Sequence, residues 1–294
     1  MQSLSRKIAG AGDLQGVVSA MKALAASSIG QYEKAVQSLN DYYHTVELGL
    51  SACLRQAEPV PLPHRQRKDT GPIGAVVFGS DQGLVGRFNE VIVDLALDTL
   101  KKLPGKTKQI LAVGDRVHSL LTDANFAPAR LLTVPTSVHG ITPLIGEVLI
   151  EIQTAQDKGD VHDVYLFHNR PKSGAAYDPV CHRLLPFDRE WRRKLTALPW
   201  PDKKLPQIVN GPKPALDAFI KGYLFVLLFQ ACAESLNSEN ASRLAAMQRA
   251  EKNIKQILED LNLEFHRLRQ ESIDEELFDV VSGFEALAKH AHHS

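Results

Sequence analysis

The placement of proline is the feature that most constrains how this chain can fold. All 16 prolines of the 294-residue sequence lie between Pro59 and Pro214, which leaves proline-free tracts of 58 and 80 residues at the two ends. Proline in a helix interior costs about 3 kcal/mol or more, so long helices are expected only in the end tracts. The sequence therefore predicts two long terminal helices and a middle segment of different architecture.

The C-terminal tract also carries a heptad pattern. Residues spaced alternately three and four apart are apolar with one exception, a glutamate. The series is Leu244, Met247, Glu251, Ile254, Leu258, Leu261, Phe265 and Leu268. Such a stripe is typical of a coiled-coil seam. In the N-terminal tract, helical spacing connects Leu14, Val17, Met21, Leu24 and Ser28. Because both helices join the same middle segment, we expect them to form an antiparallel coiled coil.

Short apolar runs alternate with helical patterns in the middle segment. Strand-like runs occur at 73–78, 109–113, 131–134, 163–168 and 179–187, and helix-like patterns at 90–103, 115–122 and 142–158. This alternation favours a Rossmann-like α/β domain with a mostly parallel sheet. The predicted organisation is an N-terminal helix at 1–58, a central α/β domain at 72–205 and a C-terminal helix at 212–288, with proline-rich connectors between them.

Composition excludes several classes of protein. The 34 basic and 34 acidic side chains give a formal net charge of zero, so we expect no general nucleic-acid binder. Cys53, Cys181 and Cys232 are isolated, which predicts neither a disulfide framework nor a zinc site and fits a reducing compartment. The most apolar stretch, 223–233, is about half a membrane span, so we interpret it as a buried helix of a soluble chain.

One glycine-rich loop is a candidate ligand site. It begins at Gly79, ends at Gly86 and includes Asp81 and Gly83, after one predicted strand and before a helix. Its backbone N–H groups are suited to a phosphate, but the spacing matches neither the dinucleotide nor the P-loop motif. A tight structural turn is therefore the favoured interpretation. Asp81 is suited equally to catalysis and to helix capping.

Other polar groups give no convincing active site. The histidines lack metal-ligand spacing, and no serine or cysteine lies in a nucleophile elbow. The basic run 189–194 is expected to be solvated surface, with partner docking as the less favoured interpretation. We therefore expect no cofactor, no metal and no catalytic residue.

Three segments together resemble the γ subunit of F-type ATP synthases. SAMKALAAS at 19–27 is similar to the family's N-terminal motif K-A-M-x-M-V-A-A-S. GSDQGLVGRFN at 79–89 resembles the loop T-D-R-G-L-C-G-G-L-N, and SENASRLAAM at 238–247 matches S-E-x-x-A-R-M-x-A-M. The same tract continues with RQESIDEEL at 269–277 and VVSG at 280–283, which are similar to the family's C-terminal motifs.

The resemblance implies a non-catalytic central rotor shaft. In that family the terminal helices form a shaft inside a ring of α and β subunits, and the α/β domain contacts the ε subunit and the membrane ring of c subunits. The shaft couples proton or sodium transport to ATP synthesis. It also implies a peripheral position on the cytoplasmic side of the bacterial inner membrane.

The resemblance further implies which residues contact the β subunit. They are Met21, Lys22, Ala23, Arg243, Arg269, Gln270, Asp274 and Glu276. Ala23 replaces the family's second methionine, Asp274 its usual threonine and Val85 its loop cysteine. These departures indicate a divergent branch, compatible with an alternative ion-translocating F-type ATPase.

Two other functions compete with the rotor. A doubly wound α/β enzyme would use the turn Gly79–Gly86 as a phosphate site and the terminal helices as dimerisation arms. A coiled-coil scaffold would use the helices for assembly alone, without an energetic role.

Overall fold

The computed structural model describes residues 1–56, 71–104, 108–201, 206–208 and 211–291, with side chains up to residue 282 except that of Pro212. The chain forms two compact units. Unit 1 comprises residues 1–24 and 245–294, and unit 2 comprises residues 25–244. Helices α1 (Gln2–Gln56) and α6 (Pro212–Ala291) each contribute to both units. The predicted division at 1–58, 72–205 and 212–288 stays a prediction, and its first connector, 59–71, lies almost entirely outside the described residues.

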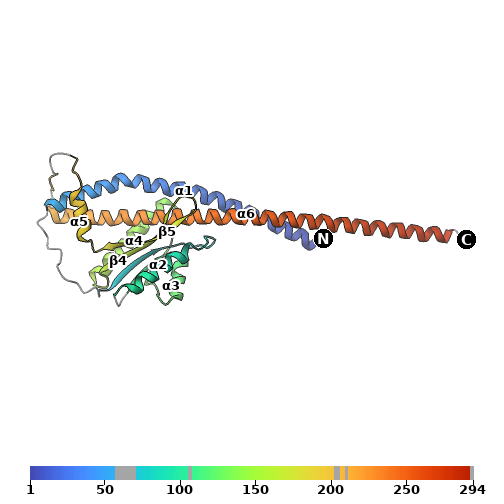
Figure 1. The fold of residues 1–294 in the computed structure, drawn as a ribbon, viewed down its shortest axis with the longest axis horizontal. Coiled ribbons are helices and arrows are strands. Elements are labelled where there is room, and N and C mark those ends of the chain that lie inside the picture. Colours follow the sequence, from blue (N-terminus) through green and yellow to red (C-terminus); the bar gives the residue numbers. More distant parts are fainter. Residues whose placement is uncertain (57–70, 105–107, 202–205, 209–210, 292–294) are drawn as a thin grey trace. The chain divides into compact units, whose positions relative to one another are not determined.

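Unit 2 is built around one sheet (Figure 1). In the described residues the strand order is β3-β2-β1-β4-β5, and β5 alone is antiparallel to its neighbour. The elements are β1 (Ile73–Phe78), α2 (Phe88–Lys102), β2 (Lys108–Val113), α3 (Asp115–Asp123), β3 (Arg130–Leu132), α4 (Val138–Asp157), β4 (Asp163–Pro171), β5 (Tyr177–Leu185) and α5 (Arg189–Ala197). The prediction of a mostly parallel α/β sheet is confirmed. The first strand is central, as in doubly wound folds.

Both faces of the sheet are covered, which explains why its strands are almost continuously apolar. Successive side chains of a strand point to opposite faces. Val76 and Phe78 pack in one core with α1, α4 and α6. Ala75 and Val77 pack in a second core with α2 and α3. Figure 1 shows the same layers, with α1 and α6 on one side of the sheet and α2 and α3 on the other.

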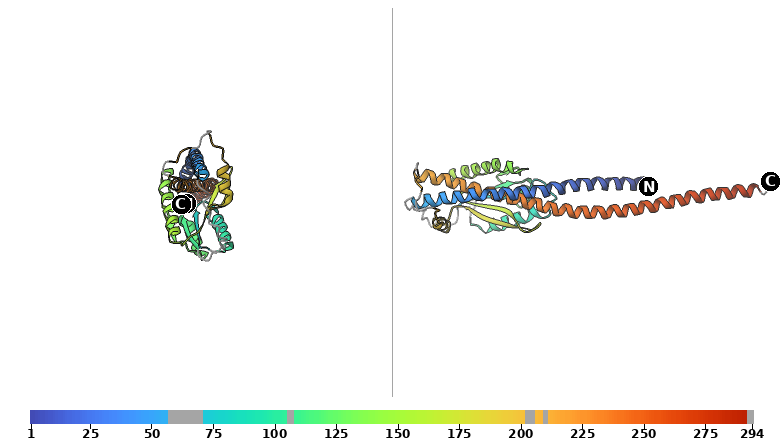
Figure 2. Two further views of the ribbon diagram at one scale, coloured as in Figure 1. Left: turned by 90° about the vertical axis from the view of Figure 1, so that its left-hand side faces the viewer. Right: turned by 90° about the horizontal axis from the view of Figure 1, so that it is seen from above.

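Helices α1 and α6 are antiparallel within unit 2, as predicted. A side chain at Gly49 would overlap the Phe219 ring, and the rings of Tyr43 and Tyr223 stack with centroids 5.8 Å apart. As the residue number decreases along α1, the residue number of its contact on α6 therefore increases. Figure 2 shows α4 in the same layer, alongside these two helices.

Residues 223–242 of α6 form a helical segment that is buried on almost every side. By length and composition alone, the part of α6 within Lys213–Ser282 is long and apolar enough to cross a membrane. Its most apolar side chains, however, fill the core between α1 and the sheet, and Leu228 and Ala233 are 0 % exposed. A helix that is apolar on all sides is expected in such a position, so the interpretation of 223–233 as a buried helix is confirmed.

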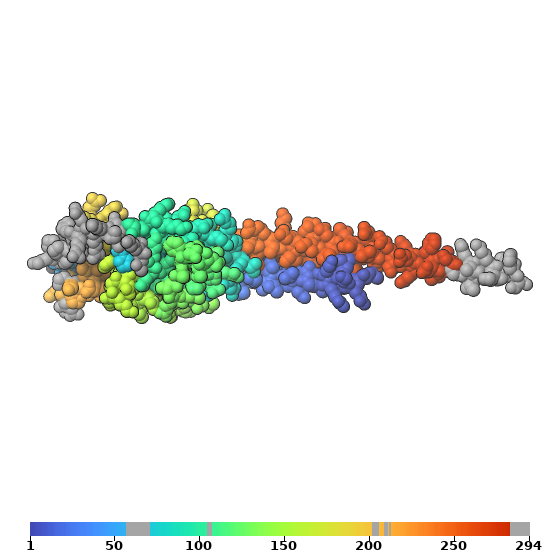
Figure 3. Space-filling model, turned by 90° about the horizontal axis from the view of Figure 1, so that it is seen from below, coloured from blue at the N-terminus to red at the C-terminus, as the bar shows by residue number. Residues whose placement is uncertain are grey.

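Unit 1 consists of the beginning of α1 and the second part of α6, which lie against each other (Figure 3). The heptad positions from Ile254 to Leu268 are half-buried, whereas every residue between them is exposed. On α1, Leu4 and Val18 are buried. The polar member of the stripe, Glu251, lies 2.5 Å from the Lys22 ammonium. The heptad pattern is thus confirmed as the contact face of α6.

The helical spacing in the N-terminal tract correctly indicates a helix, but of the large apolar side chains that it connects only Met21 is half-buried. Leu14, Val17 and Leu24 are between 56 and 69 % exposed. Helix α1 uses a different face, which carries Leu4 and Val18, because that face meets the stripe of α6.

Three further details differ from prediction. Strand β3 ends at Leu132 rather than at 134, because the Val134 N–H donates to the Asp81 carboxylate instead of to a strand. Helix α4 begins at Val138, four residues before the predicted start, with Pro143 inside its early turns. The basic run 189–194 is mostly exposed, as expected, but it lies in helix α5, which the sequence analysis missed.

The close approach of α1 to α6 at Gly49 generates a stability prediction. We expect Gly49→Ala to destabilise the chain by about 1–3 kcal/mol, because the added methyl overpacks against Phe219. Gly30→Ala, in the same helix, has open space around the new methyl and should stabilise the helix by up to about 1 kcal/mol. Chemical denaturation followed by circular dichroism measures both. Equal effects of the two substitutions would contradict the close contact.

Candidate functional site: the loop after β1 and the buried segment of α6

The loop that follows β1 is held by its own hydrogen bonds. The Gly79 N–H donates to the Val113 carbonyl at 2.8 Å, and the Ser80 N–H donates to Asn89 Oδ1 at 3.0 Å. Asn89 returns a hydrogen bond from its amide to the Ser80 hydroxyl at 2.9 Å. A side chain at Gly79 would overlap Val117, and Gly86 has a φ of +59°. Both glycines are therefore required by the turn itself.

Asp81 connects three loops at the carboxyl edge of the sheet. Its Oδ1 accepts from the Asp115 N–H and its Oδ2 from the Val134 N–H, both at 3.0 Å. Asp115 is the first residue of α3, so Asp81 caps that helix from another loop. Of the two roles that the sequence left open for Asp81, the structure shows helix capping, although the helix is α3 rather than the one that follows its own loop. Because Gly79 and Ser80 already use their N–H groups, the turn offers less to a phosphate than its glycine content suggested.

The loop is joined to α6 across about 150 residues of sequence. The Ser242 hydroxyl donates to the Val85 carbonyl at 2.5 Å. The Ser238 hydroxyl donates to the Asn169 carbonyl at 3.0 Å, and the Asn169 amide donates to the Phe88 carbonyl at 2.9 Å. The structure thus brings together two of the motif segments, 79–89 and 238–247, which no local pattern had linked.

Helix α6 also carries a buried ion pair between two of its own residues. The Arg243 guanidinium lies 2.6 Å from Glu239 Oε1, and the two side chains are only 12 and 7 % exposed. Burial raises the pKa of Glu239, and the Arg243 charge offsets part of that effect. Arg243 is therefore already paired within the chain, which the resemblance did not reveal.

A second buried carboxylate ties α6 to β4. The His168 ring donates from Nε2 to Glu234 Oε2 at 2.9 Å, and Arg170 donates from Nε to the same oxygen at 3.3 Å. Burial opposes ionisation of Glu234, but the hydrogen bonds from His168 and Gln230 and the Arg170 charge outweigh it and lower the pKa. Sequence reasoning missed this cluster because β4 and α6 supply its members. The available signal was an acidic residue inside an apolar helical stretch.

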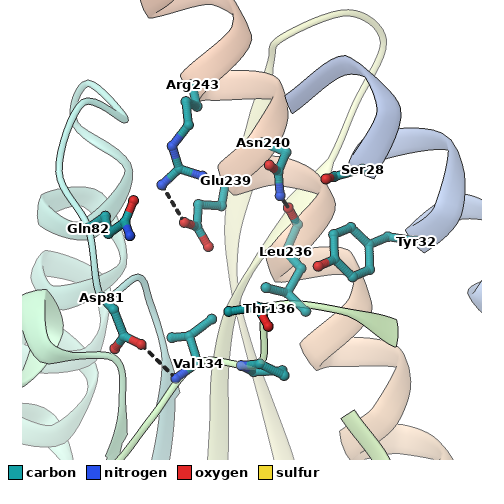
Figure 4. Close-up of a pocket in the computed structure, with 11 residues that line it drawn as sticks. Ser28, Tyr32, Asp81, Gln82, Val134, Thr136, Leu236, Glu239, Asn240 and Arg243 are labelled. Carbon is teal, nitrogen blue, oxygen red and sulfur yellow. Dashed lines mark hydrogen bonds and ion pairs between the residues drawn. The ribbon is translucent and has the colours of Figure 1, made fainter. Parts of the chain in front are cut away.

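A pocket of about 190 Å³ lies where α1, α6 and two loops meet within unit 2. Figure 4 shows Asp81 and Gln82 on one side, Tyr32 and Ser28 on the other, and Glu239 and Arg243 above. Of the predicted site residues, the pocket contains Asp81 from the turn and Arg243 from α6.

The remaining predicted contact residues belong to unit 1. Met21 and Lys22 are half-buried, and Lys22 donates to Glu251 Oε2. Ala23 is exposed, and so are the four polar residues of the C-terminal segment: Arg269, Gln270, Asp274 and Glu276. Within the part of the chain that the structure describes, these four form no hydrogen bond or ion pair. They are available to another chain, whereas Lys22 and Arg243 are engaged.

Sequence comparison identifies relatives along the whole chain. A family model described as ATP synthase matches residues 1–287. ATP synthase gamma chains of Polynucleobacter necessarius and Pasteurella multocida are 25 and 26 % identical to this chain, over 97 % of it and 99 % of their own length.

Fold comparison gives the same architecture. A chain from the rotor of the Euglena gracilis mitochondrial ATP synthase matches with a TM-score of 0.61 at 16 % identity, covering 92 % of this chain and 98 % of that one. A chain from the central stalk and c-ring of the Tetrahymena thermophila enzyme matches with a TM-score of 0.55 at 19 % identity, covering 80 and 99 %. With the family model spanning almost every residue, the chain belongs to the ATP synthase gamma family.

Proposed function

We propose that this chain is the central rotor shaft of a proton- or sodium-translocating F-type ATP synthase. The observation that carries the proposal is the family match over residues 1–287. The chain is a non-catalytic part of the complex, and the catalytic sites belong to its partners. The fold suits such a role. One part of α6 is held in the core of unit 2, and its second part forms a helix pair with the beginning of α1 in unit 1, where many side chains are exposed.

The mechanism that follows is coupling by differential contact. A shaft whose sides differ contacts each surrounding catalytic subunit differently, so each orientation favours another conformation of each site. Turning the shaft then moves every site through binding, synthesis and release. The coupling free energy comes only from contacts that differ between orientations.

We propose as direct partners the α and β subunits of a catalytic ring, an ε subunit and a membrane ring of c subunits. For the β contact, Arg269, Gln270, Asp274 and Glu276 are the first candidates, because they are exposed and unengaged among the described residues. Met21 and Ala23 add apolar contact area. Lys22 and Arg243 take part only if a partner's carboxylate replaces Glu251 or Glu239, since both cations are already paired.

We place the complex on the cytoplasmic side of a bacterial inner membrane, with this chain peripheral to it. Bacterial gamma chains match this chain over 99 % of their own length, which supports that location. The enzyme alternative is not favoured. Its phosphate turn already uses backbone N–H groups for internal hydrogen bonds, and Asp81 serves as a helix cap.

Native mass spectrometry of the complex purified through this chain tests the proposal. We expect one copy of this chain with three copies each of two larger subunits. A scaffold without an energetic role would assemble equally well, so the turnover of the complex is measured as well. A homodimer, or this chain alone with a bound small molecule, would overturn the rotor assignment.

Gln270 provides a test at the level of one side chain. We expect Gln270→Ala to reduce ATP turnover of the assembled complex about two- to tenfold, because a lost hydrogen bond costs about 0.5–1.5 kcal/mol. The isolated chain should keep its thermal stability, since Gln270 is exposed. Asn253→Ala, at another exposed amide of α6, is the control. Unchanged turnover in Gln270→Ala would remove this residue from the proposed contact.

The pairing of Lys22 with Glu251 predicts a charge-reversal pattern and a pH dependence. We expect Lys22→Glu to lower the melting temperature of the helix pair and the double variant Lys22→Glu/Glu251→Lys to restore most of it, more clearly at low salt. Lys7→Glu, at an exposed site, should have little effect.

The hydrogen bond from Lys22 lowers the pKa of Glu251. The pair therefore contributes to the stability of the folded state above the pKa that Glu251 has in the unfolded chain. This contribution is lost as the pH falls through the pKa of Glu251 in the folded chain. Calorimetry between pH 7 and 3 should show the variant and wild-type melting temperatures converging at low pH. No restoration in the double variant would contradict the pairing of Lys22 with Glu251.

A further inference from the structure

The pocket between α1, α6 and the two loops has an excess of negative charge. Its walls contain the carboxylates of Asp81 and Glu239 and a single cation, Arg243. That cation already pairs with Glu239 at 2.6 Å. One carboxylate charge is therefore left without a counter-charge in the lining.

Most of the polar groups that face this space can accept hydrogen bonds. Glu239 uses Oε1 for Arg243, and no described residue donates to its Oε2. The Asn240 amide donates to the Leu236 carbonyl at 2.8 Å, which leaves its Oδ1 as the unused end. Tyr32 directs its hydroxyl into the pocket from the opposite side (Figure 4). Acceptors converge from two helices and the loops, as a ligand with several N–H groups requires.

Burial makes the negative charge of Glu239 unfavourable, and a bound cation would stabilise it. Glu239 is only 5 % exposed, and its burial raises its pKa, with Asp81 adding to the effect. Burial likewise raises the pKa of Tyr32. A buried charge is stabilised when it is paired and hydrogen-bonded. The volume of about 190 Å³ far exceeds the ~30 Å³ share of one water molecule, so it accommodates the end of a basic side chain.

We propose that this pocket receives the cationic end of an arginine or lysine side chain from a partner subunit of the complex. Glu239 and Asp81 supply the charge, and Asn240 and Tyr32 supply further acceptors. The inference rests on the proposed function, because the occupant comes from the assembled complex. It adds an anchoring contact on unit 2 that involves Glu239, which was not among the predicted contact residues.

The first test uses the isolated full-length chain and agmatine, which carries a guanidinium group. Titration followed by NMR should shift the backbone amides of residues 239–243, and urea, which resembles guanidinium but is neutral, should not. Glu239→Gln should weaken agmatine binding at least tenfold. Asp98→Asn, an exposed acid on α2, should leave it unchanged.

Because burial raises the pKa of Glu239, a bound cation should lower it and release protons, so affinity should rise as pH increases through the folded value. If urea and agmatine shift the same amides equally, the pocket does not select charge and the proposal is wrong.

A second variant guards against loss of folding in Glu239→Gln. Gln82 is exposed at the pocket edge, so Gln82→Lys should fold normally and place its own ammonium in the pocket. We expect this variant to abolish agmatine binding, whereas Gln82→Met should retain it. Agmatine binding that survives Gln82→Lys would contradict the location.

The final test distinguishes a partner's side chain from a free cation. A photo-crosslinking amino acid in place of Thr136, an exposed pocket residue, should attach this chain to a partner subunit in the purified complex. Gln82→Lys should reduce that crosslink. A crosslink to no partner, in a complex that still has its full set of subunits, would overturn this inference and leave the rotor intact. Failure of the wild-type chain to join any such complex would overturn the proposed function instead.

Discussion

The burial of residues 223–242 of α6 on almost every side is the constraint on which the rest of unit 2 depends. A helix with so many apolar side chains is stable in water only when it is covered all round. Here α1 and α4 lie beside it, and the sheet supplies the remaining wall. Complete burial of a large apolar side chain contributes about 1.5–3 kcal/mol. Within unit 2, the sheet and the parts of α1 and α6 that pack on it therefore share one core.

Complete burial then dictates the chemistry of the polar residues in the same segment. Polar groups removed from water usually find partners, as Glu234, Ser238, Glu239, Asn240 and Ser242 do. The buried Ser235 hydroxyl has none among the described residues. These contacts add little net stability, because desolvation offsets much of the attraction between buried charges. Removing one partner of a buried ion pair, however, typically costs about 3–5 kcal/mol, and leaving a buried hydrogen-bonding group without its partner costs about 1–3 kcal/mol. The contacts of Glu234 and Ser238 with β4 and of Ser242 with the loop after β1 fix the rotation of α6 against the sheet. The partners of Glu239 and Asn240 lie on α6 itself.

Much of this fold could be predicted from sequence because its signals are local. The proline-free ends, the heptad from Leu244 to Leu268 and the alternation in the middle segment each reflect one element at a time. The misses involve partners far apart in sequence. Val134 leaves the strand because Asp81 binds it, and the buried face of α1 is set by the stripe on α6. The placement of Arg243 beside Glu239 follows helical spacing, but its position in one pocket with Asp81 and Gln82, some 160 residues earlier, does not.

The distribution of exposed apolar side chains fits a shaft that must turn. Leu14, Val17 and Leu24 on α1 and Ile273, Leu277 and Phe278 on α6 all lie on unit 1 and are at least half exposed. Apolar contacts are non-directional, so a surrounding surface can slide over such side chains without breaking an oriented bond at each step. Hydrogen bonds are directional and therefore distinguish one orientation from another. Under the proposed function, exposed apolar side chains that stand among polar residues such as Arg269 and Gln270 combine low resistance to rotation with defined stopping positions.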